Sequence, residues 1–154
     1  MINFTDEMRD LYQETILDHN RSPRNFRKIE GAESLEGFNP LCGDRMTIYI
    51  KMDGELIADI GFEGSGCAIS KSSASIMTTI IKGLDKKSAL EWFEKFHELI
   101  TRPLGAKIDS ERFGKLLVFA QVSEYPSRVK CAGLAWHTLK SILDGKKESV
   151  STEN

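Results

Sequence analysis

The first half of the chain changes its hydrophobic period twice. Residues 5 to 19 place apolar side chains at helical spacing and predict an amphipathic helix. A short strand is predicted over residues 34 to 38. Residues 46 to 52 then alternate apolar and polar side chains, and residues 56 to 64 follow after an Asp-Gly-Glu turn. Together the last two segments predict an antiparallel hairpin.

The period becomes helical from residue 67 onward. Apolar residues recur at helical spacing over residues 68 to 84, 86 to 100, 110 to 125 and 127 to 145. The order is therefore one helix, a small sheet and then helices only. This segregation predicts an α+β fold, in which helices cover one face of a small antiparallel sheet of about three strands.

Length, composition and charge narrow the class of protein. The chain has 154 residues, which is about one domain, and we assign that domain to residues 1 to 145. Residues 146 to 154 are polar and are expected to form a disordered tail. The net charge of -2 gives no strong attraction to nucleic acid or to an anionic membrane. No apolar run is long enough to span a membrane, and the N-terminus lacks the pattern of a signal peptide, so we expect a cytoplasmic protein.

The cysteines raise the question of chemistry. There are three, Cys42, Cys67 and Cys131, and they are widely separated. An odd number without a secretory signal argues against a disulfide framework. Two interpretations stay open from the count alone: three buried thiols that act as small apolar side chains, or a reduced metal or catalytic site.

All three thiols lie at the ends of predicted elements. Cys42 and Asp44 belong to the stretch Asn-Pro-Leu-Cys-Gly-Asp-Arg, on the loop before the hairpin. Cys67 stands at a helix start, and Cys131 lies early in the last helix. A helix N-terminus favours the thiolate, which is both the nucleophile and the metal-binding form of cysteine.

Three thiolates and one carboxylate supply the four ligands of a tetrahedral zinc site. The oxygen ligand is harder and exchanges more readily than sulfur, so such a set suits a site that changes a ligand during its work. Four anionic ligands exceed the charge of the metal, and nearby cations should offset the excess. The cations adjacent to ligands in sequence are Arg45, Arg128 and Lys130.

Other candidate groups are weaker. His19, His97 and His137 are alternative ligands, but each lies in a predicted helix away from the cysteine motifs, and we expect ordinary surface or core residues. The Gly-Ser-Gly-Cys stretch superficially suggests a phosphate-binding loop, yet Ser70 precedes Lys71 where that pattern requires glycine.

Four segments, residues 12 to 26, 39 to 45, 61 to 77 and 125 to 140, resemble the iron-sulfur cluster assembly family typified by IscU and the N-terminal part of NifU. The match runs in order over about residues 5 to 145. Its Cys-Gly-Asp, Gly-Cys-Ala-Ile-Ser and Arg-Val-Lys-Cys motifs are highly specific in combination, and they are most similar to those of the SufU branch.

The chain departs from the scaffold branch of this family. In that branch a histidine precedes the third cysteine and a Leu-Pro-Pro-Val-Lys segment lies just upstream, whereas here Lys130 precedes Cys131 and residues 124 to 128 read Glu-Tyr-Pro-Ser-Arg. Residues 86 to 109 add helical material of the SufU kind. The resemblance therefore implies a zinc-dependent sulfurtransferase that accepts persulfide sulfur from a cysteine desulfurase.

The resemblance also implies roles for individual residues. It assigns the zinc ligands to Cys42, Asp44, Cys67 and Cys131, and the sulfur acceptor to Cys42. We expect Asp44 and Arg128 to hold the metal site and the acceptor thiolate in register. A SufS-like desulfurase is the implied donor, and an iron-sulfur assembly scaffold the implied recipient. Two alternatives stay open: a scaffold that carries a transient iron-sulfur cluster, and a structural zinc domain that only binds a partner.

Overall fold

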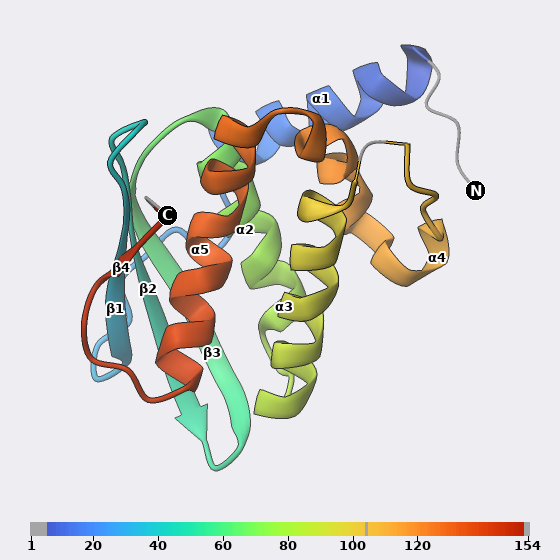
Figure 1. Cartoon of the computed structure of the whole chain (residues 1–154). Coiled ribbons are helices and arrows are strands. Elements are labelled where there is room, and N and C mark those ends of the chain that lie inside the picture. Colours follow the sequence, from blue (N-terminus) through green and yellow to red (C-terminus); the bar gives the residue numbers. More distant parts are fainter. Residues whose placement is uncertain (1–5, 104, 153–154) are drawn as a thin grey trace.

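A four-stranded sheet forms one layer of the protein. The computed structural model describes residues 6–103 and 105–152. Strands β1 (Glu33–Asn39), β2 (Asp44–Asp53) and β3 (Leu56–Ser65) form the antiparallel part, as the hydrophobic alternation predicts. The strand order is β3-β2-β1-β4, because β4 (Val150–Ser151) adds to the outer side of β1 (Figure 1).

Strand β4 corrects two expectations. It runs parallel to β1, so the sheet is mixed and has one strand more than predicted. The tail is also ordered in part, since the backbone N–H of Thr152 donates to the carbonyl of Phe38 at 3.1 Å and Thr152 is buried. A two-residue strand of mixed polarity has no readable period, and its pairing depends on where the last helix returns the chain. Residues 153 and 154 lie outside the described part.

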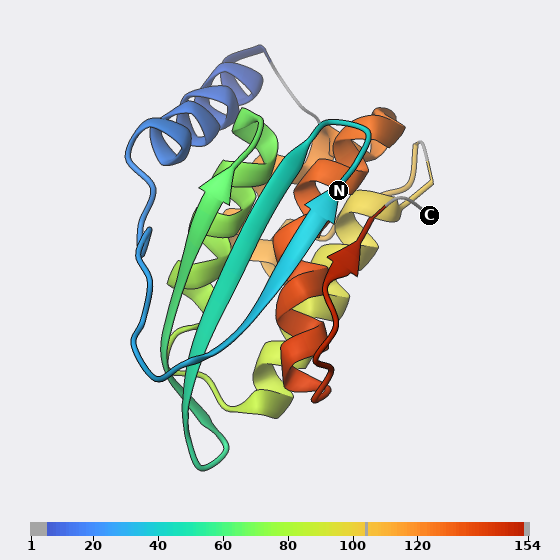
Figure 2. The ribbon, with the colours of Figure 1, turned by 90° about the vertical axis from the view of Figure 1, so that its left-hand side faces the viewer.

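The helices cover one face of the sheet only (Figures 1 and 2). Side chains of β2 explain this, because Met46, Ile48 and Ile50 are fully buried while Arg45 and Lys51, which flank this row and point to the other face, are exposed. The buried row packs against α5, and it belongs to one hydrophobic core with side chains of α2. The α+β class is thereby confirmed.

The helical layer is close to prediction except in one segment. The spacing predicts one helix over residues 110 to 125, but the segment divides into two because Gly114 turns the chain with φ +53°. The second part winds as a 3-10 helix. In no described helix is there a stretch long and apolar enough to cross a membrane. The helices are α1 (Asp6–Arg21), α2 (Ala68–Ile81), α3 (Lys86–Thr101), α4 (Ser110–Phe113), η1 (Gly114–Glu124) and α5 (Pro126–Leu143).

Helix α1 lies across one end of the molecule (Figure 1). It contains no buried residue, and residue 5, at the start of the predicted helix, lies outside the described part. One tie to the body is the contact between His19 Nδ1 and Ser75 Oγ of α2, at 2.7 Å. The β1–β2 turn, the β3–α2 connection and the start of α5 meet at this same end of the molecule, and they carry the cysteines.

Candidate metal centre

The β1–β2 turn positions Cys42 and Asp44, which differ in burial although their ligand atoms lie within 4.8 Å of each other. Asn39 and Asp44 are paired across the two strands, and the N–H of Gly43 donates to the carbonyl of Asn39 at 2.8 Å. Gly43 has φ +72°, a conformation in which glycine is favoured. The outcome is that Cys42 is exposed while Asp44 is fully buried.

Cys67 is held at the start of α2 as its N-cap residue. Its sulfur accepts from the N–H of Ser70 at 3.5 Å, and its own N–H donates to Asp44 Oδ1 at 2.9 Å. Gly66 makes this approach possible, because a Cβ there would lie 2.7 Å from Asp44 Oδ1 and 2.5 Å from Ser70 Oγ. The thiol of Cys67 is exposed, as is that of Cys42.

Cys131 lies in the second turn of α5 and is buried. Its sulfur is 3.5 Å from Cys42 Sγ and also accepts from Asn39 Nδ2 at 3.5 Å. Asn39 is itself fully buried, and its Oδ1 accepts from the N–H of Leu41 at 3.3 Å. One amide side chain therefore contacts both the turn that carries Cys42 and the thiol of Cys131.

The four residues chosen from the sequence come together in space. Ligand atoms of Cys42, Asp44 and Cys131 all lie within 4.8 Å of one another. Cys67 lies outside this tight group, but its sulfur is 3.9 Å from Asp44 Oδ2. Tetrahedral zinc with bonds of about 2.3 Å to sulfur and about 2.1 Å to oxygen places neighbouring ligands roughly 3.6–3.8 Å apart. The Cys42–Cys131 and Cys67–Asp44 separations are close to that spacing, so the donor set fits zinc.

The thiols differ in how readily they ionise. A hydrogen bond from the Cys131 thiol, helped by the N–H of Ser70, lowers the pKa of Cys67 to about 6, although burial opposes the shift. The same hydrogen bond and burial raise the pKa of Cys131 well above its ordinary value. Cys67 is thus the first of this pair to become a thiolate.

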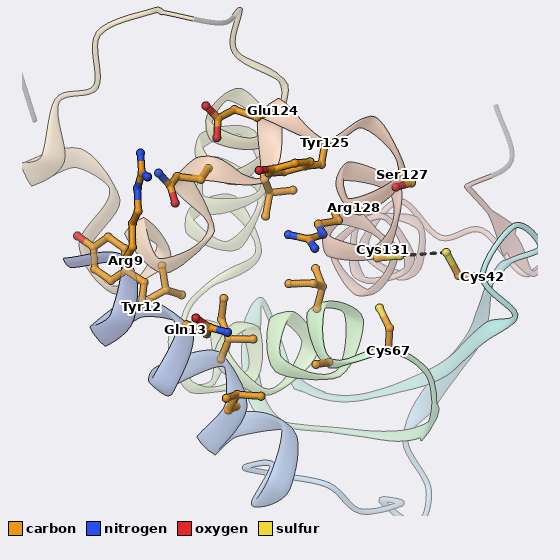
Figure 3. A pocket seen from close by; sticks show the side chains of 17 residues that line it. Arg9, Tyr12, Gln13, Cys42, Cys67, Glu124, Tyr125, Ser127, Arg128 and Cys131 are labelled. Carbon is orange, nitrogen blue, oxygen red and sulfur yellow. Dashed lines mark hydrogen bonds between the residues drawn. The ribbon is translucent and has the colours of Figure 1, made fainter. Parts of the chain in front are cut away.

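A cleft of about 830 Å³ opens beside the thiols. Cys42, Cys67 and Cys131 lie at one end of it and α1 forms the opposite wall (Figure 3). Arg128 also lines the cleft, with its guanidinium carbon 4.7 Å from the centre of the Tyr125 ring. This cation–π contact holds a positive charge near the site.

The other two neighbouring cations point elsewhere. Arg45 pairs with Glu36 at 3.0 Å and lies over the ring of Phe38. Lys130 lines a different groove. Of the three cations considered from the sequence, Arg128 alone lines the cysteine cleft.

The histidines stay away from the thiols, in line with expectation. His19 contacts Ser75, while His97 and His137 pack against each other with ring centroids 5.7 Å apart. No histidine is among the residues that line the cysteine cleft in the described part of the chain.

Three contacts at this site are not predicted from the sequence. Asn39 and Ser70 contact the sulfurs directly, and Tyr125 supports Arg128. The Cys67-x-x-Ser70 spacing at a helix start is a capping pattern and could have revealed Ser70. The roles of Asn39 and Tyr125 depend on elements that are distant in sequence.

Comparisons with known proteins agree with this geometry. Residues 11–132 match the family described as the NifU-like N terminal domain. The chain is 37% identical over 140 residues to the zinc-dependent sulfurtransferase SufU of Bacillus subtilis (strain 168), covering 90% of this chain and 93% of that protein. It is also 37% identical over 134 residues to the iron-sulfur cluster assembly scaffold protein IscU of Thermotoga maritima, covering 86% and 92%.

A solved structure shows the same fold. The crystal structure of a protein from Fervidobacterium islandicum AW-1, named provisionally as an iron-sulfur cluster assembly scaffold for the SUF system, superposes with a TM-score of 0.78 at 38% identity. The match covers 90% of this chain and 99% of that one. The family match, the relatives and the shared fold together show that this chain belongs to the NifU-like N-terminal domain family of iron-sulfur cluster assembly proteins, which includes IscU and SufU.

Proposed function

We propose that this protein is a zinc-dependent sulfurtransferase that accepts persulfide sulfur from a cysteine desulfurase. The observation that carries the proposal is the position of Cys42: an exposed thiol at the mouth of a cleft, with its sulfur 3.5 Å from the buried thiol of Cys131. The similarity to SufU of Bacillus subtilis supports it. In this proposal the zinc ligands are Cys42, Asp44, Cys67 and Cys131.

Each residue has a distinct part in the reaction. Zinc, when bound, keeps the coordinating thiols deprotonated at neutral pH. Docking of the desulfurase brings its persulfide to the exposed thiol of Cys42, while Cys131 and Asp44, which would hold the zinc, stay in place because they are buried. Arg128 lines the same cleft and stabilises the Cys42 thiolate by its charge.

The transfer step needs no oxidant. The Cys42 thiolate attacks the outer sulfur of the desulfurase persulfide, and a new sulfur–sulfur bond forms on Cys42. The original bond of the persulfide breaks, and its electron pair leaves with the desulfurase cysteine as a thiolate. In this proposal the persulfide on Cys42 then delivers its outer sulfur to a downstream iron-sulfur assembly scaffold in the cytoplasm.

Labelled sulfur tests the proposal. Desulfurase turnover is measured with and without this protein, and the added sulfur is located by mass spectrometry. We expect turnover to rise, label to appear on Cys42, and Cys42→Ala protein to lose uptake. Ser127→Ala is a matched control, because Ser127 lines the same cleft without a thiol. Parent-rate uptake by zinc-loaded Cys42→Ala protein would falsify the acceptor assignment; label on Cys131 would move the role there.

The scaffold function is the second candidate, and relatives named IscU at 33% and 37% identity favour it. Lys130, in the place of the scaffold branch's histidine, favours the sulfur carrier. Purified protein that is colourless with about one zinc supports the carrier. Brown protein that passes a cluster to an apo-acceptor supports the scaffold. A purely structural zinc predicts unfolding on zinc removal and no effect on desulfurase turnover.

A further inference from the structure

A second large groove lies on the other side of α5 from the cysteine cleft. It measures about 880 Å³ and runs between α3, α5 and the segment that ends in β4. None of the residues that line it lines the cysteine cleft. Its volume is in the usual range for small-molecule sites, about 300–1,000 Å³.

Aromatic rings form a preorganised wall of this groove. Phe93 and His97 of α3 are stacked with ring centroids 5.9 Å apart, and His137 of α5 packs edge-on against both, at 5.2 Å and 5.7 Å. Each ring is fixed by the other two. The wall therefore offers a fixed apolar surface to the groove.

Two residues that line this groove carry buried polar atoms without a hydrogen-bond partner. Among the described residues, three buried side-chain nitrogen or oxygen atoms have no hydrogen-bond partner: His97 Nδ1, Trp136 Nε1 and Thr152 Oγ1. His97 and Thr152 both line the groove, and Thr152 is only 8% exposed. Buried polar atoms without partners are rare in folded proteins, and each calls for a reason such as an unseen ligand.

The charged side chains that line the groove favour an anionic ligand. Lys130, Lys140 and Lys146 line it, against the single carboxylate of Glu94, although Lys140 is paired with Asp144 outside the groove. The chain as a whole carries a net charge of -2, so this surface runs against the overall balance. Ammonium, hydroxyl and imidazole groups are hydrogen-bond donors suited to anionic oxygens.

We propose that the groove between α3 and α5 binds a small organic anion whose phosphate or carboxylate oxygens meet Lys146, His97 and Thr152. The aromatic wall takes the apolar part of the ligand. The site is independent of sulfur transfer, since its residues are separate from the cysteine cleft.

Nuclear magnetic resonance titration of the zinc-loaded protein tests this site. Inorganic phosphate, adenosine monophosphate and citrate are added separately at about 0.15 M salt, which screens diffuse attraction beyond about 8 Å. We expect saturable shifts of groove amides with at least one probe, at a dissociation constant of about 1 mM or tighter. The probe that binds most tightly identifies the class of ligand. Phosphate indicates a bare anion, adenosine monophosphate a phosphate ester, and citrate a carboxylate.

Two variants and one control make the test specific. Thr152→Val removes the hydroxyl but keeps the shape and the backbone bond to Phe38, and Lys146→Gln removes a charge; each should weaken binding about tenfold, as loss of a charge-assisted hydrogen bond does. Lys87→Gln is the control, because Lys87 is exposed on α3 and does not line the groove.

The proposal would be overturned by any of three results: no saturable shifts with any probe, shifts confined to the cysteine cleft, or an equal loss of binding in Lys87→Gln. Zinc content and sulfur uptake of Thr152→Val should equal those of the parent, so this test is separable from that of the proposed function.

Discussion

The two sides of the candidate metal centre are built differently. Its closed side consists of Asn39, Asp44 and Cys131, which are all buried. Asn39 donates to the sulfur of Cys131, and Asp44 accepts from the backbone N–H of Cys67. Its open side consists of Cys42 and Cys67, which are both exposed at the cleft. A ligand on the closed side cannot leave without disturbing the core, whereas one on the open side can. The division suits a site that retains its metal while it exchanges one thiolate.

Exchange of single cysteines for serine should reveal the difference between the two sides most clearly. We expect Cys131→Ser to lower zinc affinity by more than about a hundredfold, beyond the 10–100-fold loss typical of an outer hydrogen-bond partner. The loss of zinc affinity in Cys42→Ser should be about tenfold smaller than in Cys131→Ser, because a solvent molecule can occupy the exposed ligand position. Competition with a chromogenic chelator measures both.

Equal losses in the two variants would contradict the division into fixed and exchangeable ligands. Zinc-free parent protein provides the reference for unfolding, since metal binding and folding are linked. The melting temperature of the Cys42→Ser protein should also be closer to that of the zinc-loaded parent than the melting temperature of the Cys131→Ser protein is.

Asn39 tests the closed side without removal of a ligand. Asn39→Ala leaves the Leu41 N–H and the Cys131 sulfur without their amide partner. We expect zinc affinity to fall about 10–100-fold and the free energy of unfolding to fall by about 1–3 kcal/mol. Chelator competition and urea unfolding measure these two quantities.

Asn39→Asp is the matched variant for this position. It keeps an acceptor for the Leu41 N–H but puts a negative charge in place of the donor to Cys131. Zinc affinity should fall further than in Asn39→Ala while the turn is better preserved. The role assigned to Asn39 fails if both variants bind zinc like the parent.

The sequence predicts the candidate thiols and carboxylate of both sides, but not the amide of Asn39. The resemblance proposes the ligands from short motifs: Cys42 and Asp44 share one motif, and Cys67 caps the helix that follows β3. Asn39 stands in the same turn, yet its contact with Cys131 joins residues 92 positions apart, and no local pattern encodes it.

The fold divides in the same way. Met46, Ile48 and Ile50 alternate with polar residues, so the hairpin could be read directly from the sequence. Strand β4 has two residues and forms only because α5 returns the chain beside β1. Elements specified by their own period are predictable, and elements specified by a distant neighbour are not.

Arg128 tests the open side of the centre, and the expected effect of its replacement is smaller than that of the cysteine and Asn39 variants. Arg128→Ala should slow sulfur transfer about tenfold, since contacts to charged groups contribute about 1.5–3 kcal/mol, and should change thermal stability little because Arg128 is exposed. The rate of label uptake and the melting temperature measure the two effects. Arg45→Ala is the matched control, because Arg45 also adjoins a ligand in sequence but pairs with Glu36 away from the cleft. Equal losses in rate and stability would return Arg128 to an ordinary surface role.

The smallest effect concerns α1, the outer wall of the open side. Burial lowers the pKa of His19, the positive charges of Arg24 and Lys115 add to the shift, and Asp18 opposes it. The folded state therefore binds the His19 proton less well than the unfolded state, whose pKa is about 6.5. Stability from neutral His19 is complete above that value and is lost as the pH falls through 6.5 toward the folded pKa.

Comparison with His19→Gln isolates this contribution, because zinc ligands titrate equally in both proteins. The free energy of unfolding is measured in urea from about pH 8 to about pH 5.5, a range that spans the ordinary histidine pKa. The advantage of the parent over the variant should shrink as the pH falls, and α1 should loosen from α2 as the contact between His19 and Ser75 is lost. A difference that stays constant with pH would show that the attachment of α1, and with it the wall of the cleft, does not depend on the protonation of His19.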